Sequence, residues 1–93
     1  MTERAVVTSI MAYLARIGAW RMKVHGDIYA VGIPDIIACY HGRFIAIECK
    51  DGNNKPTKLQ SSVIRKINEA GGIAFVAYGI REVEERLKQD GIL

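Results

Sequence analysis

Two short apolar runs joined by a turn stand out in the pattern of apolar and polar positions along this chain. Residues 33–40 and 43–50 are rich in Ile, Phe, Tyr and Ala, and only the turn-forming pair His41-Gly42 separates them. Both runs have the length of a strand and are too short for a typical helix, so the pattern predicts a β-hairpin. A two-residue turn at this pair and a four-residue loop around it give the same strand register.

The rest of the chain divides into helix-like and strand-like segments. Apolar residues at helical spacing predict three helices, over residues 3–17, 57–70 and 80–89. Thr2 and Thr57 are expected to begin the first two, and Gly18 and Gly71 to end them. The third is expected to present Val83 and Leu87 to the core, and the apolar stripe of the second comprises Leu59, Val63, Ile64, Ile67 and Ala70. Short apolar runs predict strands over 20–24 and 73–78, with a glycine-bearing loop around Gly26 and Asp27 between the first strand and the hairpin. The result is a single mixed α/β domain over residues 1–93 with the order α-β-β-β-α-β-α.

The hairpin register brings three charged side chains together. It sets Asp35 directly opposite Glu48, and such residues share a face with Cβ atoms about 5 Å apart. Strand alternation places Lys50 on the face of Glu48. Two carboxylates this close repel by about 3 kcal/mol at an effective dielectric constant near 20, which a divalent cation would offset. The alternative is a solvated sheet face, where Lys50 pairs with one carboxylate and contributes little.

These residues resemble the PD-(D/E)xK nuclease superfamily, and the wider pattern is similar to its VRR-NUC branch. The resemblance rests on five segments that cover nearly the whole chain: Thr2-Glu3-Arg4, Gly32-Ile33-Pro34-Asp35, the run 43–50 that ends in Glu48-Cys49-Lys50, Leu59-Gln60, and Ala70-Gly71-Gly72-Ile73. It implies a restriction-endonuclease-like core, a mixed sheet flanked by helices, and hydrolysis of DNA phosphodiesters with Mg²⁺ or Mn²⁺.

The resemblance also assigns roles to individual residues. Asp35 and Glu48 are expected to bind the metal, with the backbone carbonyl of Cys49 as a further oxygen ligand, and Lys50 is expected to position water or neutralise the transition state. Glu3 and Gln60 match two further site residues of the family. Both also have a purely structural interpretation, because an acid is favoured in the first turn of a helix and Gln60 stands at capping-box spacing from Thr57.

Charge and size indicate the partners. The net charge of +3 over 93 residues is mildly basic, which favours a polyanion. A chain this short has a thin core, so a homodimer is expected to supply further burial. The DNA contacts expected near the site are Lys55, Lys58, Asn53 and Asn54, with Arg4, Arg21, Lys23 and His25 as further candidates if the fold brings them close.

Two cysteines and the lack of a long apolar run suggest the compartment. Cys39 and Cys49 point to opposite faces in the predicted register, so a disulfide between them is not expected. No run approaches the about 20 apolar residues of a membrane span, and the N-terminus lacks the pattern of a secretory signal. A soluble protein of the cytoplasm, in a bacterial cell or a phage-infected host, is expected.

The reaction predicted from the sequence is more definite than the substrate. By the resemblance, a stand-alone domain of this kind is expected to cut four-way (Holliday) junctions, with flaps or nicks as the next possibilities. A bare nuclease domain has little room to read sequence, which favours recognition of DNA shape. Two alternatives stay open: a DNA-binding accessory module of the same fold that does not cleave, and a small metal-binding protein unrelated to nucleic acid.

Overall fold

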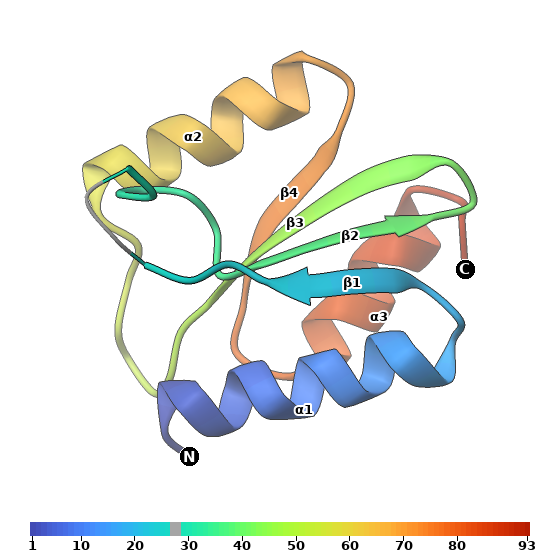
Figure 1. Ribbon diagram of the computed structural model, residues 1–93, viewed down its shortest axis with the longest axis horizontal. Coiled ribbons are helices and arrows are strands. Elements are labelled where there is room, and N and C mark those ends of the chain that lie inside the picture. Colours follow the sequence, from blue (N-terminus) through green and yellow to red (C-terminus); the bar gives the residue numbers. More distant parts are fainter. Residues whose placement is uncertain (27–28) are drawn as a thin grey trace.

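The structure, a computed structural model that describes residues 1–26 and 29–93, has a four-stranded sheet with helices on both faces (Figure 1). The sheet is mixed and its strand order is β1-β2-β3-β4. The predicted α/β class, with its restriction-endonuclease-like order α-β-β-β-α-β-α, is confirmed. The elements are α1 (Glu3–Arg16), β1 (Trp20–Lys23), β2 (Ile36–Tyr40), β3 (Arg43–Cys49), α2 (Lys58–Glu69), β4 (Ile73–Ala77) and α3 (Ile80–Gln89).

The predicted hairpin is formed by β2 and β3. Tyr40 pairs with Arg43, and the antiparallel register runs back to the pair Ile36 and Ile47. His41 and Gly42 both have positive φ angles, of 50° and 77°, which is the two-residue turn that matches the twist of paired strands. The register predicted from the sequence is therefore confirmed along the whole of β2.

The first strand of the hairpin begins later than the sequence suggested. The prediction started at residue 33, whereas β2 starts at Ile36. Pro34 has no N–H to donate to a ladder, and it is buried rather than paired. The carboxylate of Asp35 accepts the N–H of Cys49 at 2.8 Å, so a side chain continues the pairing where the strand ladder stops.

One face of the sheet is covered by α1 and α3 (Figure 1). Three residues of β3 on this face, Ile45, Ile47 and Cys49, are fully buried. Val83 and Leu87 of α3 are also fully buried, as their spacing predicted. This face holds the hydrophobic core of the domain, which also includes Val6, Val7, Ile10, Tyr13 and Leu14 of α1 and Ile36, Ala38, Ile73, Phe75 and Ala77 of the sheet.

The opposite face of the sheet is covered only in part. Helix α2 crosses from β3 to the parallel strand β4, and among the described residues it contacts these two strands but not β1 or β2. It is a strongly amphipathic helix, yet none of its residues is buried. Its apolar stripe, expected from Leu59, Val63, Ile64, Ile67 and Ala70, is thus present but only half covered.

Two further expectations concern the cysteines and the first loop. Cys39 is exposed, Cys49 is buried, and both are free thiols, as predicted. The loop expected around Gly26 and Asp27 falls partly on residues 27 and 28, which lie outside the described part of the chain. None of the helices in that described part is both long and apolar enough to cross a bilayer.

Candidate metal centre

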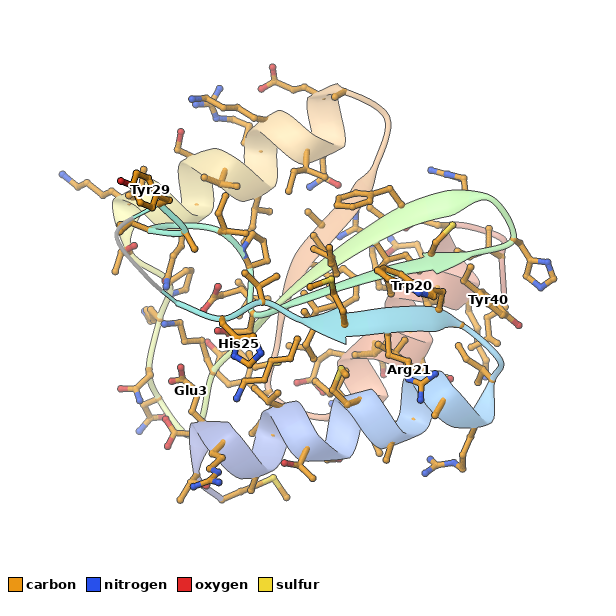
Figure 2. All side chains as sticks on the ribbon, in the orientation of Figure 1. Glu3, Trp20, Arg21, His25, Tyr29 and Tyr40 are labelled. Carbon is orange, nitrogen blue, oxygen red and sulfur yellow. The ribbon has the colours of Figure 1, made fainter. Side chains whose placement is uncertain are left out.

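Three carboxylates from three separate elements meet at one end of the sheet. Glu3 comes from the first turn of α1, Asp35 directly precedes β2, and Glu48 lies near the end of β3. One oxygen of each lies within 4.8 Å of the others. Figure 2 shows Glu3 at the N-terminal end of α1, on the side toward the sheet. The structure therefore brings Glu3 to the pair that the hairpin register predicted.

Asp35 is fixed from both its backbone and its side chain. Its carbonyl accepts the N–H of Val24 at 2.8 Å, and its Oδ2 accepts the N–H of Cys49, also at 2.8 Å. Pro34, which is buried, fixes the preceding backbone torsion. These contacts orient the carboxylate toward β3 before any ligand binds, so little ordering is needed on binding.

Glu48 is the most unusual group in the site. It is only 2% exposed, and its Oε1 is buried without a hydrogen-bond partner among residues 1–26 and 29–93. Its Oε2 lies 3.6 Å from the ammonium of Lys50, itself 9% exposed. The alternative of a solvated sheet face with a surface ion pair is therefore wrong for Glu48 and Lys50. A buried carboxylate oxygen without a partner is costly, and such an atom in a native structure indicates a ligand or a catalytic role.

The electrostatics of the site agree with its geometry. Burial, followed by the charge of Asp35, raises the pKa of Glu48 to about 8. The Lys50 ammonium lowers this pKa and Glu3 raises it further, and neither reverses the shift. In the absence of a cation, the cluster thus retains a proton near neutral pH, because its carboxylates cannot all ionise at this spacing. A bound divalent cation would displace that proton.

The donor set fits a hard divalent cation. Three carboxylates offer only oxygen ligands, which suit Mg²⁺ or Mn²⁺ rather than a soft metal. The thiol of Cys49 is not a competing ligand, because burial and the nearby carboxylates raise its pKa to about 12 and keep it protonated. Its backbone carbonyl stays the predicted further ligand. Glu3, Asp35 and Glu48 are the residues that could hold the ion.

Gln60 has a structural role that the spacing had left open. Its side-chain oxygen accepts the N–H of Thr57 at 2.9 Å, and its own N–H donates to the Thr57 hydroxyl at 3.1 Å. This is a complete capping box at the start of α2. A direct part for Gln60 at the metal stays a hypothesis, whereas its part in the helix cap is a feature of the structure.

The residues predicted to contact DNA lie in the loop between β3 and α2 and at the first residue of α2. Asn53 and Lys55 are exposed, while Asn54 hydrogen-bonds Asp51 and receives a hydrogen bond from the Tyr78 hydroxyl at its carbonyl. These positions leave Asn53 and Lys55 accessible to a phosphate, whereas the Asn54 side chain is engaged within its own loop.

Lys58 lines an open hollow on α2 that was not predicted from the sequence. The other lining residues are Pro56, Ser61, Ser62 and Arg65. Positions 58, 61, 62 and 65 follow helical spacing, so a search for hydroxyl and basic residues on one helix face would have found them. Arg65 is partly engaged with Glu69 at 3.1 Å. The hollow adds hydroxyl donors beside the predicted lysine.

The more distant basic candidates differ in how close they lie to the carboxylates. Figure 2 shows His25 at the same end of the sheet as Glu3, whereas Arg21 lies toward the other end of β1. Arg4 and Lys23 are exposed. Of the two labelled in the view, His25 is the one whose position agrees with a contact beside the carboxylates.

Comparison with known proteins identifies the family of the chain. A family model described as archaeal Holliday junction resolvase (Hjc) matches residues 9–90, a range that includes Asp35, Glu48 and Lys50 but begins after Glu3. A search of curated proteins found no match. The match does not show the VRR-NUC branch that the motif suggested. Since it spans most of the 93 residues, the chain belongs to the archaeal Holliday junction resolvase family.

Proposed function

We propose that this protein is a divalent-metal-dependent endonuclease that hydrolyses phosphodiester bonds in four-way DNA junctions. One observation carries the proposal. Among the described residues, one Glu48 oxygen is buried without a hydrogen-bond partner, and Glu48, Asp35 and Glu3 each have an oxygen within 4.8 Å of the others, beside a largely buried lysine. No hydrogen bond from the described part of the chain accounts for this oxygen, and a cation would. The family match supports the junction as substrate.

Each side chain of the site has a distinct part. Glu3, Asp35 and Glu48 hold Mg²⁺ or Mn²⁺, with the carbonyl of Cys49 as a further candidate ligand. When bound, the metal lowers the pKa of a coordinated water and stabilises charge on the phosphate oxygens. The Lys50 ammonium lies 3.6 Å from Glu48 and is fixed by burial, so it can orient the attacking water or neutralise the charge that develops on the phosphate.

The substrate is proposed from the family and from charge. Lys55 and Lys58 follow the metal-binding strand and present exposed ammonium groups for backbone phosphates, which position DNA without reading its sequence. A four-way junction needs a cut in two strands, and each chain has one such site among its described residues. We therefore propose that the protein acts as a homodimer. The VRR-NUC-like motif and a phage or bacterial source remain hypotheses.

Cleavage assays with matched variants test this function. The protein is incubated with labelled four-way junction, flap and linear duplex, each with Mg²⁺, Mn²⁺ or EDTA. We expect junction cleavage with metal alone, reduced about 1,000-fold or more by Asp35→Asn, because the loss of one metal ligand removes transition-state stabilisation. Glu69→Gln is the control, since Glu69 is an exposed acid paired with Arg65 outside the cluster. It should cleave at the wild-type rate.

Lys50→Ala separates chemistry from binding. If Lys50 acts on the reacting water or phosphate, the variant loses turnover while junction affinity, measured with Ca²⁺ in place of Mg²⁺, changes far less. Unchanged cleavage by Lys50→Ala would exclude this role. A wild-type protein that binds the junction under every metal condition and never cleaves it would instead assign the chain to the accessory-module alternative.

A further inference from the structure

The end of β4 is joined by hydrogen bonds to the strand that carries the metal centre. β3 and β4 are parallel, with Cys49 beside Ala77, and the carbonyl of Ala77 accepts the N–H of Lys50 at 3.1 Å. The N–H of Tyr78 belongs to the same peptide plane as that carbonyl, and it donates to Oε1 of Glu82 at 2.8 Å. Both polar groups of this peptide are therefore engaged, which fixes the backbone from which the Tyr78 side chain starts.

The Tyr78 side chain reaches the loop that follows the metal-binding strand. Its hydroxyl donates to the carbonyl of Asn54 at 2.7 Å. That carbonyl shares a peptide plane with the N–H of Lys55, so the hydroxyl holds the plane from which Lys55 begins. Figure 1 shows the end of β4 and this loop at the same end of the sheet as the start of α1, which carries Glu3. Tyr78 therefore connects the backbone of Lys50 to the backbone of Lys55.

The backbone of Lys55 is restricted on its other side as well. Pro56 follows it, and a residue before proline is largely limited to extended conformations. The preceding turn is closed by two hydrogen bonds between Asn54 and Asp51, one between the backbones at 3.0 Å and one between the side chains. Lys55 thus has an exposed side chain on a restricted backbone. Such a backbone lowers the ordering cost when the ammonium binds a phosphate.

We propose that Tyr78 is a positioning residue for the DNA backbone, whose hydroxyl sets where Lys55 binds a phosphate relative to the phosphate that is cut beside Lys50. The inference rests on the proposed function, because that function places Lys50 at the cut phosphate and Lys55 at another one. Phosphates follow one another at regular spacing along a strand. Two lysines on one fixed frame therefore bind them at a lower ordering cost than two lysines of which one lies on a mobile loop.

The alternative is a hydrogen bond that only stabilises the fold. Tyr78 is 39% exposed, and a hydrogen bond between neutral groups in such a place contributes little to stability. The two roles differ in what the hydroxyl and the Lys55 ammonium share. If the hydroxyl positions Lys55, removal of either group weakens the same phosphate contact, whereas a purely structural hydroxyl acts independently of Lys55.

A double-mutant cycle on junction affinity separates these roles. Tyr78→Phe, Lys55→Ala and the combined variant bind a labelled four-way junction in Ca²⁺, so that affinity is measured without cleavage. We expect the dissociation constant to rise about 10-fold in Lys55→Ala and about 5-fold in Tyr78→Phe. The combined variant should lose about 10-fold, not the about 50-fold that independent effects would give.

Salt dependence identifies the lost contact as one to a phosphate. The logarithm of affinity falls linearly with the logarithm of salt concentration, and each phosphate contact contributes about 0.9 to the slope. The slope should become shallower by about this amount in Lys55→Ala, by part of it in Tyr78→Phe, and no further in the combined variant. With Mg²⁺ and saturating junction, kcat of Tyr78→Phe should stay within about two-fold of the wild type, because the groups at the cut phosphate are intact.

Tyr40→Phe is the matched control. Tyr40 is a partly exposed tyrosine directly before the hairpin turn, and Figure 2 shows it at the other end of the sheet from Glu3. The variant loses the same hydroxyl far from the loop, so affinity, salt slope and kcat should equal those of the wild type. Thermal unfolding of each variant, without DNA, should show a single folded protein in every case.

The outcomes distinguish this role from the nuclease function. Independent effects of Tyr78→Phe and Lys55→Ala, an unchanged affinity in either single variant, or a loss of kcat larger than the loss of affinity would each overturn the role of Tyr78. Junction binding that shows the coupling without any cleavage contradicts the function and leaves this role standing. A wild-type chain that does not bind the junction in Ca²⁺ would overturn both.

Discussion

The two faces of the sheet differ in how completely helices cover them. On the face toward α1 and α3, Ile45, Ile47 and Cys49 of β3 are fully buried against two helices. On the other face, the β3 side chains become more buried along the strand. Phe44 is exposed, whereas Ala46 and Glu48 are buried, and among the described residues one Glu48 oxygen has no hydrogen-bond partner. The first face contributes stability, and the second face holds the metal centre and exposed apolar side chains such as Phe44.

This difference separates two uses of the same strand. β3 runs through the middle of the domain, so its position is fixed by the packing on the first face. That packing holds Glu48 in an environment that is unfavourable for a carboxylate in the absence of a cation. Functional sites commonly have such a local cost, which the rest of the fold offsets. The contrast can be tested by substitutions on either side.

The largest expected effect is on the free energy of unfolding, and it compares two adjacent residues of β3 that face opposite sides of the sheet. Ile45→Ala removes a fully buried side chain, so we expect the free energy of unfolding to fall by about 3 to 4 kcal/mol. Phe44→Ala removes a side chain that is 46% exposed, and the expected loss in the monomer is about 1 kcal/mol. Urea denaturation at several protein concentrations measures both losses.

Concentration dependence sharpens this comparison. If Phe44 lies in a dimer interface, the cost of Phe44→Ala grows with protein concentration, because association stabilises only the wild type. The cost of Ile45→Ala should vary much less with concentration. Equal losses for the two variants in dilute protein would show that both faces are packed alike, which would contradict the contrast.

The second effect follows from the raised pKa of Glu48. This pKa is about 8 in the folded state against an ordinary value of 4.5, so the folded state holds a proton that the unfolded state releases. Stability of the metal-free protein should therefore fall as pH rises from about 4.5 to about 8. Thermal unfolding in EDTA across this pH range measures the slope.

Glu48→Gln and added metal break this dependence in different ways. The amide does not ionise, so the slope that Glu48 contributes should disappear, and the metal-free variant should be more stable than the wild type at pH 8. Mg²⁺ should stabilise the wild type increasingly over the same pH range and leave the variant nearly unchanged. Stabilisation by Mg²⁺ that is equal in both proteins would place the metal elsewhere.

The third effect concerns the loop that carries Asp35. Gly32 has a φ of +81°, and a side-chain carbon there would meet the Cγ of Leu59 at 2.6 Å. Gly32→Ala should cost about 2 kcal/mol, since it adds a clash to an unfavourable backbone conformation. Gly18 has a similar φ of +85° with open space around it, so Gly18→Ala isolates the backbone cost, at about 1 kcal/mol.

The same pair of variants tests whether this loop positions the metal centre. Gly32 stands three residues before Asp35, so displacement of the loop should weaken Mg²⁺ binding, measured by calorimetry, in Gly32→Ala but not in Gly18→Ala. Equal stability losses and equal metal affinities in the two variants would show that the contact with Leu59 does not position Asp35.

Much of the architecture was accessible from local patterns. The hairpin register followed from the length of its turn, and that register alone was enough to place Asp35 opposite Glu48. Helix bounds were predicted to within a residue or two because Thr2, Thr57, Gly18 and Gly71 mark helix ends by their own chemistry. These features depend on neighbours in sequence, which a single chain reveals directly.

Other features depend on contacts between distant segments. The sequence contains an apolar stripe on α2, but periodicity alone does not tell whether the protein itself covers that stripe. Likewise, the pattern predicted two facing carboxylates but not that Glu48 is almost fully buried with one oxygen unpartnered. The contact between Gly32 and Leu59 joins a loop to a helix, and no local signal indicates it.

The smallest expected effect distinguishes the two interpretations of Gln60. Its carboxamide oxygen is engaged with the N–H of Thr57, so Gln60→Ala should lower stability by about 1 kcal/mol through loss of the capping box. Glutamate also completes a capping box, and Gln60→Glu should therefore keep wild-type stability and cleavage. Gln89→Ala, at an exposed glutamine near the end of α3, is the control and should change neither. Wild-type stability with lost cleavage in Gln60→Glu would mean that the carboxamide acts beside the metal or phosphate, so that the first turn of α2 belongs to the active site.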